Sequence, residues 1–579
     1  MRRTGWFQRS ELTAALWSFR REFLLVGLFS AVANLLMLTP TIYMLQIYDR
    51  VLVSYSQLTL AAISLISLFL LGIMAVSEWT RSQVLVRAGV RLDEQLGTRV
   101  FNASFRASLG SNGASPARAF SDLLQVRQFL TGQGIFAFFD APWAPIYIAV
   151  TFLLHPLLGW VAIVFACIQL ALAWFGHRHT VAPSQAASRA ASEVEIYLQG
   201  KLRNSEVLES MGMVQNLRRR WHARHQQALA AHGTAQALSQ RVVAWSKFIR
   251  YSQQSLSLGA GALLVIDGQL TPGAMIAANV LMSRALAPID MLVGNWRGVV
   301  SAHAAFRRLE QLLQQFAPPV AAGAQEAPSG AVTLRNVVAR AAGREEAILK
   351  NIGFSIPAGT VVALLGPSGS GKSTLARALV GIWPDLEGEV LLDERPLASW
   401  DRRELGPHLG YLPQDVELFD GTIAENIARL GRIDSAQVIA AARCAGLHEM
   451  LLRFPSGYDT PIGEAGALLS AGQRQRIALA RAVYGEPALV VLDEPNANLD
   501  DAGEAALMNT VAQLKARGKT VVLITHRPLA VGAADWLLLL NQGELVASGT
   551  REEVLAKLAP SHKPAAPPSG ASTLSPQPA

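Results

Sequence analysis

The chain has 579 residues, of which 51% are hydrophobic and 16% charged, and its formal net charge is +8. The mean hydropathy of +0.27 is high for a soluble protein and indicates a membrane portion. The length allows several domains. The two cysteines, Cys167 and Cys444, lie far apart in different predicted domains, which argues against a structural disulfide and suits a reducing cytosolic face.

Six apolar runs have the ~20 residues that a helix needs to cross a bilayer. The first begins at Phe23, directly after Arg20 and Arg21, and no small-residue cleavage site follows it. It is therefore predicted to be a membrane span and not a cleaved signal peptide. The predicted spans are residues 23–45, 57–77, 137–154, 157–175, 251–268 and 273–293.

Arginine and lysine concentrate before the first span, in residues 78–136 and in residues 176–250. Positive charge close to spans marks the cytoplasmic side, so these segments and the C-terminal domain are predicted to be cytoplasmic. The two long segments are rich in helix formers, and we expect them to continue the membrane helices as long hairpins. A separate soluble insertion is the alternative. These flanking arginines account for the positive net charge of the chain, so no nucleic-acid partner is expected.

Two charged residues fall in or near the sixth predicted span. Arg284 lies inside it and Asp290 near its inner end. A charge in a span is costly and usually faces a cavity or a partner. For Arg284 a structural ion pair and a contact with the transported substrate both remain open.

Composition also predicts the domain limits. Residues 316–330 are rich in Pro, Ala and Gly and read as a linker, and residues 559–579 as a disordered tail. The predicted organisation is a cytoplasmic N-terminus (1–22), a transmembrane domain (23–315), the linker, an α/β domain (331–558) and the tail.

The α/β domain carries the phosphate-binding pattern GxxxxGK[ST]. It follows the apolar strand 361–365 and precedes a helical segment that starts near Lys372. The glycines let backbone N–H groups surround phosphates, and the helix N-terminus favours an anion. Lys372 is expected to reach the β- and γ-phosphates of ATP, and Ser373 to ligate Mg²⁺. The predicted binding residues are Gly366, Pro367, Ser368, Gly369, Ser370, Gly371, Lys372, Ser373 and Thr374.

A second apolar strand ends in two acids. Asp493 is expected to hold Mg²⁺. Glu494, the next residue, is placed to orient and polarise the attacking water as a general base.

Further motifs resemble the ATP-binding-cassette (ABC) ATPases. The segment Leu469 to Gln473 resembles their signature, with Ala471 where glycine is commoner. Gln414 resembles the Q-loop glutamine, Asp500 the D-loop aspartate and His526 the switch histidine. The order of these motifs along the chain, together with the phosphate loop and the two acids, makes the resemblance specific. It implies a fold of a six-span polytopic helical domain (type I ABC exporter) plus an α/β P-loop cassette.

The same resemblance implies how the site works. Two cassettes pair head to tail, so that Ser470, Gly472 and Gln473 of one chain cap the nucleotide of the other. Gln414 would contact the metal and sense the γ-phosphate, Asp500 would serve the nucleotide site, and His526 would act with Glu494 in hydrolysis. One complete set per chain favours a homodimer.

One position departs from the family pattern. Ala341 falls where an aromatic residue usually stacks on adenine, about 25 residues before the phosphate loop. We expect weaker adenine preference, or stacking by another group such as Arg340.

The order of the two domains is that of exporters. Residues 138–160, 202–213, 275–290 and 405–429 resemble the type I secretion ATPases that export metalloproteases, lipases and repeats-in-toxin proteins. This implies a bacterial inner-membrane location, a periplasmic membrane-fusion adaptor and a TolC-like outer-membrane channel as partners. It also implies a secreted protein substrate that crosses unfolded with an uncleaved C-terminal signal. The chain leaves no room for an N-terminal peptidase domain before residue 23.

Three alternatives were weighed. An exporter of a lipid or a small hydrophobic molecule would carry the same cassette. A non-transporting ATPase lacks spans, which the apolar runs oppose. An ATP-gated channel would not need the intact Glu494 and His526.

Overall fold

The computed structural model describes residues 10–109, 116–202, 204–317, 326–341, 346–525 and 527–558. The chain divides into two compact units, an all-helical unit that precedes residue 319 and an α/β unit that follows it. The predicted tail, part of the predicted linker and His526 lie outside the described residues.

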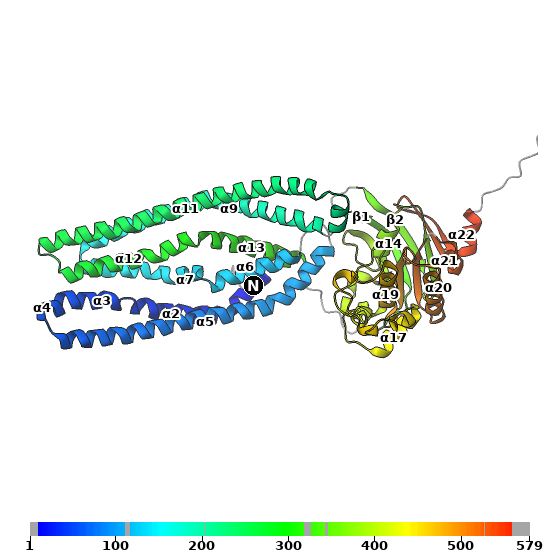
Figure 1. Ribbon diagram of the computed structural model, residues 1–579, viewed down its shortest axis with the longest axis horizontal. Helices are drawn as coiled ribbons and strands as arrows, with labels where there is room; N and C mark the ends of the chain where they lie inside the picture. Colours follow the sequence, from blue (N-terminus) through cyan, green and yellow to red (C-terminus); the bar gives the residue numbers. More distant parts are fainter. Residues whose placement is uncertain are drawn as a thin grey trace, which may run out of the picture. The chain divides into compact units, whose positions relative to one another are not determined.

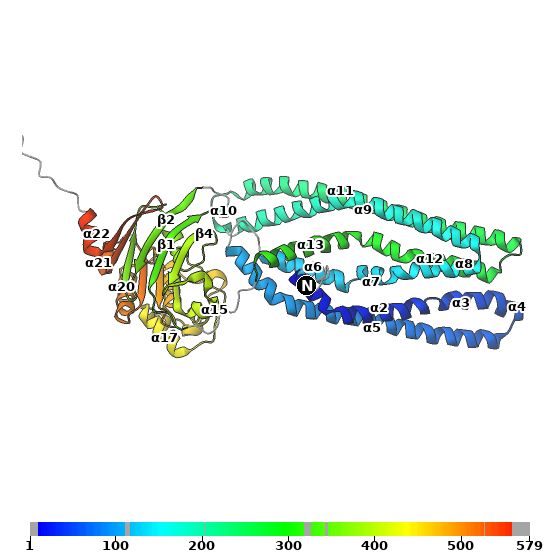
Figure 2. The ribbon, with the colours of Figure 1, turned by 180° about the vertical axis from the view of Figure 1, so that it is seen from behind.

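Long helices dominate the helical unit (Figure 1). Helices α5 and α11 have 53 residues each, about 80 Å at the usual rise per residue. This far exceeds the ~30 Å hydrocarbon core of a bilayer, so the helices extend well beyond the predicted spans. In Figures 1 and 2, α9 and α11 lie side by side. The helices are α1 (Glu11–Ser18), α2 (Arg20–Leu36), α3 (Thr39–Gln46), α4 (Leu52–Ser54), α5 (Gln57–Leu109), α6 (Pro116–Thr131), α7 (Gln133–Asp140), α8 (Ala144–Leu154), α9 (Pro156–Leu202), α10 (Ser205–Ser210), α11 (Val214–Ile266), α12 (Pro272–Gly294) and α13 (Trp296–Gln315).

Five described helical stretches are long and apolar enough to cross a membrane. They contain all the predicted spans except 251–268, which forms the end of α11. Polar residues dilute the apolar character of this stretch: Gln253 is fully buried, and the Ser257 hydroxyl donates to Asn279 Oδ1 of α12 at 2.7 Å. The count of six spans therefore stays a prediction.

Prolines break two of the spans. Helix α2 ends at Leu36 and α3 starts at Thr39, because Pro40 has no N–H to donate. A 3₁₀ turn at Ala141–Trp143 separates α7 from α8 in the same way. Between the first two predicted spans, residues Ile47–Val51 form a π-helical turn, and the chain reverses at Tyr55, whose φ is 51°.

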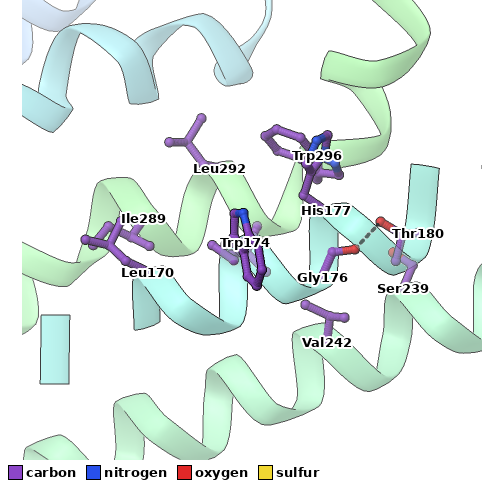
Figure 3. Close-up of a pocket in the computed structure, with 12 residues that line it drawn as sticks. Leu170, Trp174, Gly176, His177, Thr180, Ser239, Val242, Ile289, Leu292 and Trp296 are labelled. Carbon is purple, nitrogen blue, oxygen red and sulfur yellow. Dashed lines mark hydrogen bonds between the residues drawn. The ribbon is translucent and has the colours of Figure 1, made fainter. Parts of the chain in front are cut away.

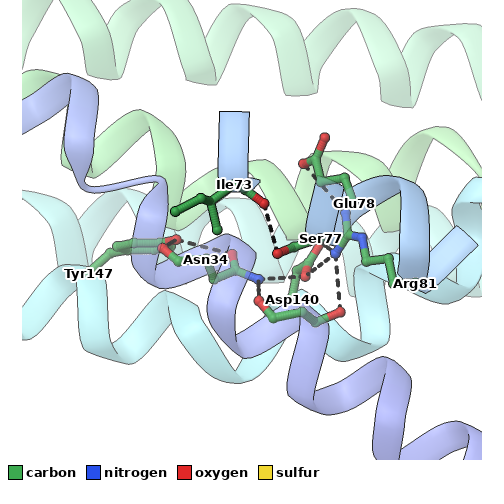
Figure 4. A network of polar contacts seen from close by, with 8 residues as sticks. Asn34, Ile73, Ser77, Glu78, Arg81, Asp140 and Tyr147 are labelled. Atoms are coloured by element: carbon green, nitrogen blue, oxygen red, sulfur yellow. Dashed lines mark hydrogen bonds and ion pairs between the residues drawn. The ribbon is translucent and has the colours of Figure 1, made fainter. Parts of the chain in front are cut away.

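A buried polar network joins α2, α5, α7 and α8 (Figure 4). Arg81 Nη1 lies 3.1 Å from Asp140 Oδ1, with the two side chains 11% and 14% exposed. The Asn34 amide donates to the same oxygen at 2.6 Å, and the Tyr147 hydroxyl donates to the Asn34 carbonyl at 2.8 Å. A charge buried among apolar helices is stable only when it is paired and hydrogen-bonded, so this network fixes how the helices pack.

A second network joins α9, α11 and α12. Ser246 Oγ donates to Asp290 Oδ1 at 2.6 Å, the buried Gln169 amide donates to the same carboxylate, and Arg250 Nη1 lies 3.7 Å from Asp290 Oδ2. The partner of Asp290 is therefore Arg250. Arg284 forms no ion pair with any described residue, so the structural pair that we considered for it is absent from the described chain.

A two-point ion pair joins α6 to α13. Arg308 Nη2 and Nε lie 2.5 and 2.8 Å from the two carboxylate oxygens of Asp122, whose side chain is 6% exposed. The Asp122 carboxylate raises the pKa of Arg308. Because the fork of the guanidinium matches both oxygens, the pair also sets the rotation of the two helices.

Arg308→Gln should destabilise the helical unit, because it leaves the Asp122 carboxylate buried without its cation. The free energy of unfolding should fall by about 2–3 kcal/mol. This is at the lower end of the usual cost of breaking a buried ion pair, because the guanidinium is partly exposed. Thermal unfolding in phospholipid-free detergent measures it. The control is Arg307→Gln at the adjacent exposed residue, which should unfold as the wild type does. Equal unfolding of all three proteins would contradict the structural role.

The α/β unit contains two sheets. The central sheet has the order β10-β9-β3-β8-β7-β6, with β9, β3, β8, β7 and β6 parallel, and the second has the antiparallel order β2-β1-β4-β5. All residues of β7 and β8 are buried, as expected for parallel strands covered on both faces. A hydrophobic cluster that includes Leu364, Leu375 and Val491 packs α14 against both sheets.

The elements of this unit are β1 (Val332–Arg340), β2 (Ala347–Ile356), β3 (Val361–Leu365), α14 (Lys372–Leu379), β4 (Leu386–Leu392), β5 (Arg395–Pro396), α15 (Arg402–Leu405), β6 (Leu409–Leu412), α16 (Ile423–Ile427), α17 (Ser435–Cys444), α18 (His448–Leu451), α19 (Ala471–Val483), β7 (Leu489–Asp493), α20 (Asp501–Ala516), β8 (Thr520–Ile524), α21 (Pro528–Ala533), β9 (Trp536–Asn541), β10 (Glu544–Thr550) and α22 (Arg551–Leu558). The parallel strands β3, β7 and β8 end at the same edge of the central sheet, which places the segments that follow them together.

Candidate ATP site

The predicted phosphate loop connects β3 to the N-terminus of α14. Two of its glycines are required by the backbone: Gly366 has φ 155° and Gly371 has φ 99°. A Cβ on Gly366 would lie 2.1 Å from the Leu540 carbonyl oxygen, and one on Gly371 would lie 2.9 Å from Leu349 Cδ2. The loop can therefore wrap close to the sheet and leave the N–H groups at the start of α14 for an anion.

Lys372 points back across this loop. Its Nζ donates to the carbonyl oxygens of Gly366 and Pro367, each at 2.9 Å, and the residue is 6% exposed. Burial lowers the pKa of Lys372, and the nearby Glu494 and Asp493 partly oppose this effect. The ammonium thus lies at the centre of the loop, where a phosphate group would complete its coordination.

Asp493 and Ser373 form a place for a hard cation. Asp493 is 1% exposed, it accepts a hydrogen bond from the Ser373 hydroxyl, and its Oδ1 has no hydrogen-bond partner. Burial raises the pKa of Asp493, with the Ser373 bond opposing it. A buried carboxylate oxygen that lacks a donor beside a hydroxyl fits Mg²⁺, which prefers oxygen ligands. No three His, Cys, Asp or Glu side chains of the described residues form another metal cluster.

Glu494 follows Asp493 at the end of β7 in a left-handed conformation, with φ 48°. Gln414 Nε2 donates to Glu494 Oε2 at 3.0 Å. The structure therefore brings Gln414, Glu494 and Asp493 to the edge of the central sheet where Lys372 lies. The order of these residues in the sequence does not by itself show that they meet. His526, which we predicted to act here, lies outside the described residues.

Ser470 begins α19 with a reciprocal cap. Gln473 N–H donates to Ser470 Oγ at 3.2 Å, and Ser470 N–H donates to Gln473 Oε1 at 2.9 Å. Such a cap fixes the start of the helix and leaves its next N–H groups exposed. Within the described chain no hydrogen bond joins Ser470 or Gln473 to the phosphate loop.

The D-loop passes directly over the signature. A Cβ on Gly472 would lie 3.0 Å from the Asn498 carbonyl oxygen, a tight contact that favours glycine here, whereas Ala471 is exposed. Asp500 caps α20 and accepts from Arg476 Nη2 at 2.6 Å. The Gly503 N–H is the main group that holds the pKa of Asp500 below its ordinary value.

Comparisons with known proteins give the family. The profile of the ABC transporter family matches residues 349–497, and that of the ABC transporter transmembrane region matches residues 23–288. The type I secretion system ATP-binding protein PrsD of Rhizobium meliloti is 42% identical over 95% of each chain. The chain belongs to the ABC transporters, in the type I secretion group. This ABC transporter is therefore an ATPase coupled to transport, embedded in a membrane by several spans.

Two further similarities extend this result. The toxin RTX-I translocation ATP-binding protein of Actinobacillus pleuropneumoniae is 28% identical over 92% of this ABC transporter and 76% of that protein. A solved bacterial Atm1-family ABC exporter with ATP bound has a TM-score of 0.81 and 23% identity, with 93% and 96% of the two chains covered. The second similarity supports the fold, in which a transmembrane ABC domain precedes the α/β domain.

The region of the missing adenine-stacking residue is partly described. Ala341 directly follows β1, and residues 342–345 lie outside the described chain. Arg340, the substitute that we suggested for stacking, pairs with Glu387, and its carbonyl accepts from Trp383 Nε1 at 3.1 Å. The guanidinium is therefore already held by a carboxylate, which weakens the case for stacking on a base.

The sequence analysis did not identify the residues that contact the ATP-site residues from the interior of the domain. Gln475 is 1% exposed and donates to the Pro495 carbonyl at 3.1 Å, next to Glu494. Arg377 lies near both Asp493 and the partly buried Tyr411, whose pKa is raised by its burial. No local pattern marks these residues, because their roles come from tertiary contacts.

The helical unit of this ABC transporter contains a cavity of about 290 Å³ between α9, α11 and α12 (Figure 3). It is lined mostly by apolar side chains, and the His177 and Trp296 rings meet edge to face at 4.6 Å between centroids. None of the predicted nucleotide residues lines it, so it is separate from the ATP site.

Ala341→Tyr should tighten ATP binding about tenfold, because an aromatic ring would restore a stacking surface worth about 1–3 kcal/mol per base. Equilibrium titration with a fluorescent ATP analogue measures the affinity. Ala341→Leu, which adds bulk without a π-face, is the control and should bind as the wild type does. Equal affinity of the tyrosine variant and the wild type would show that adenine is held elsewhere.

Proposed function

We propose that this ABC transporter uses ATP hydrolysis to export a protein substrate. The 42% identity to a type I secretion system ATP-binding protein over 95% of both chains carries the proposal. Proteins named toxin and leukotoxin translocation ATP-binding proteins are 28% identical over more than 90% of this chain, which supports a polypeptide cargo. Export of a lipid or a small hydrophobic molecule is the less supported alternative.

The proposed roles follow the geometry of the ATP site. The backbone N–H groups of residues 366–374 other than Pro367, and the ammonium of Lys372, hold the phosphates, since the loop precedes the N-terminus of α14 and Lys372 Nζ lies against it. Ser373, Asp493 and Gln414 would hold Mg²⁺, which neutralises charge that develops on the phosphates. Glu494 acts as the general base, and the Gln414 amide orients one of its carboxylate oxygens. His526 would complete this set.

We propose that two copies of the chain assemble as a homodimer. The support is that Ser470, Gly472 and Gln473 are exposed or half-buried at the N-terminus of α19, yet no described hydrogen bond ties them to their own phosphate loop. A helix N-terminus of this kind suits the γ-phosphate bound by another copy. Asp500, held by Arg476, would position the adjoining loop at that interface.

The remaining assignments also belong to the proposal. The transmembrane domain (23–315) would lie in the bacterial inner membrane, with residues 1–22 and the ATP-binding cassette (331–558) in the cytoplasm. The partners would be a periplasmic membrane-fusion adaptor, a TolC-like outer-membrane channel and a secreted protein that crosses unfolded with a C-terminal signal. Arg284 has no ionic partner in the described chain and is a candidate for the substrate path.

Glu494→Gln should retain ATP binding and lower the rate of hydrolysis about 10²–10⁴-fold, the usual cost of removing a general base. Lys372→Ala should instead lose ATP binding, because it removes the cation at the centre of the loop. Phosphate release and binding of labelled ATP separate the two effects. Glu544→Gln, at an exposed position of β10, is the control. Normal turnover by the Glu494→Gln protein would show that another group is the base.

The cargo is tested with the same Glu494→Gln protein. Reconstituted with ATP, it should retain a secreted protein of its own bacterium, and a peptide of the last residues of that protein should change the wild-type ATPase rate. A peptide with the same composition in scrambled order is the control. Retention of lipid alone, with no response to the peptide, would favour the alternative substrate.

A further inference from the structure

The helical unit contains a second, larger cavity of about 920 Å³, at the upper end of the range for ligand sites. Helices α1, α2 and α13 supply most of its wall, with one residue each from α6 and α7. The wall is mainly apolar and aromatic, and the Phe23 and Phe139 rings stack in it with centroids 6.5 Å apart. The other lining side chains include Arg20, His303, Arg307 and Glu310.

Two neighbouring arginines of the helical unit are held by acidic side chains. Arg308 is bound by Asp122 at 2.5 Å, and Arg99 by Glu11 at 3.0 Å. In contrast, the guanidinium groups of Arg20 and Arg307 have no ion pair or hydrogen bond to any described residue. Since Glu310 is the one acid among the lining residues, the cavity presents a net positive charge beside an apolar wall.

The helix that closes the cavity is firmly held. Ser10 and Thr13 form a reciprocal cap at the start of α1, and Leu12 and Phe19 are buried in a cluster with Leu309 of α13. The cavity is therefore preformed and does not need a rearrangement of α1 to accept a ligand.

Tryptophans place the cavity at the headgroup level of the membrane. Trp17, Trp79, Trp174 and Trp245 are 43%, 66%, 61% and 60% exposed, and each flanks the arginine-rich end of a predicted span. Tryptophan prefers this interfacial layer. Leu24, which is 73% exposed in the cavity wall, belongs to the apolar span that begins there.

We propose that this cavity binds an anionic phospholipid, with the lipid phosphate between Arg20 and Arg307 and an acyl chain along Phe23, Leu24 and Phe139. The lipid is a resident ligand and not the cargo, and its leaflet, the cytoplasmic one, rests on the proposed orientation of the spans. A phosphodiester supplies the acceptors that both guanidinium groups lack.

Charge disfavours another occupant from the same chain. Residues 1–9 carry Arg2, Arg3 and Arg9 and no acid, so they would bring positive charge to Arg20 and Arg307. A lipid phosphate brings the opposite charge, and the bilayer presents it at high concentration beside the apolar wall.

The test is native mass spectrometry of the full-length protein in detergent, titrated with phosphatidylglycerol or phosphatidylcholine. The wild type should bind phosphatidylglycerol more tightly than phosphatidylcholine. Arg20→Gln/Arg307→Gln should weaken phosphatidylglycerol binding about thirtyfold, from the attraction of two arginines to an anionic lipid. Arg21→Gln/Arg87→Gln, which removes the same charge at exposed residues outside the cavity, should bind as the wild type does.

Several outcomes would overturn the proposal. These are equal binding of the two lipids, equal losses in the two double variants, or displacement of the lipid by glycerol phosphate. If deletion of residues 1–9 were required before any lipid bound, that segment would be the occupant. If Arg20→Gln/Arg307→Gln changed the oligomeric state, the cavity would belong to a contact with a second copy.

A second measurement avoids a variant that fails to fold. Phosphatidylglycerol brominated in its acyl chain should quench tryptophan fluorescence more in the wild type than in Trp17→Phe, because Trp17 lines the cavity. Equal quenching would refute lipid occupancy. Neither the arginine variants nor Trp17→Phe should alter the basal ATPase rate, so a failure here is distinguishable from a failure of the proposed export function.

Discussion

Burial of parallel strands is the constraint on which the ATP site depends. Strands β3, β8 and β7 pair in parallel and are almost completely buried, so their carboxyl ends must emerge at one edge of the sheet. That edge receives the N–H groups and ammonium of the phosphate loop, and also the carboxylates of Asp493 and Glu494. Opposite charges therefore meet in a poorly solvated place, where their interactions are stronger than in water. Packing of the hydrophobic core thus determines where the residues of the ATP site lie.

In the helical unit, too, opposite charges meet in poorly solvated places. Asp140 and Asp290 are each held by an arginine and by neutral donors from other helices, so each carboxylate ties several helices together. Against this pattern, a cation without a partner is informative. Arg284 lies inside a predicted span, and Arg20 and Arg307 line an apolar cavity, and none of the three has an ionic partner among the described residues. The proposals of a substrate path and of a bound lipid start from these cations, because a charge beside apolar surface needs water or a ligand.

The proposed homodimer starts from a single chain that holds a complete set of nucleotide motifs. The cap between Ser470 and Gln473 uses the side chains within α19 and leaves the helix N-terminus open. Gly472 lies under the Asn498 carbonyl, so the signature and the D-loop form one surface. Hydrolysis that needs two such surfaces to meet provides a direct way to couple ATP to a change in the membrane helices.

The sequence alone determined the membrane helices, the cassette and the order of its motifs, because hydrophobic length and glycine spacing are local properties. It did not determine what the buried charges pair with. Asp290 meets Arg250 and not Arg284, Arg340 pairs with Glu387, and Asp49 lies in a π-helical turn. Each of these outcomes depends on which residues distant in the chain come within a few ångströms, and only packing of the helices and sheets decides that.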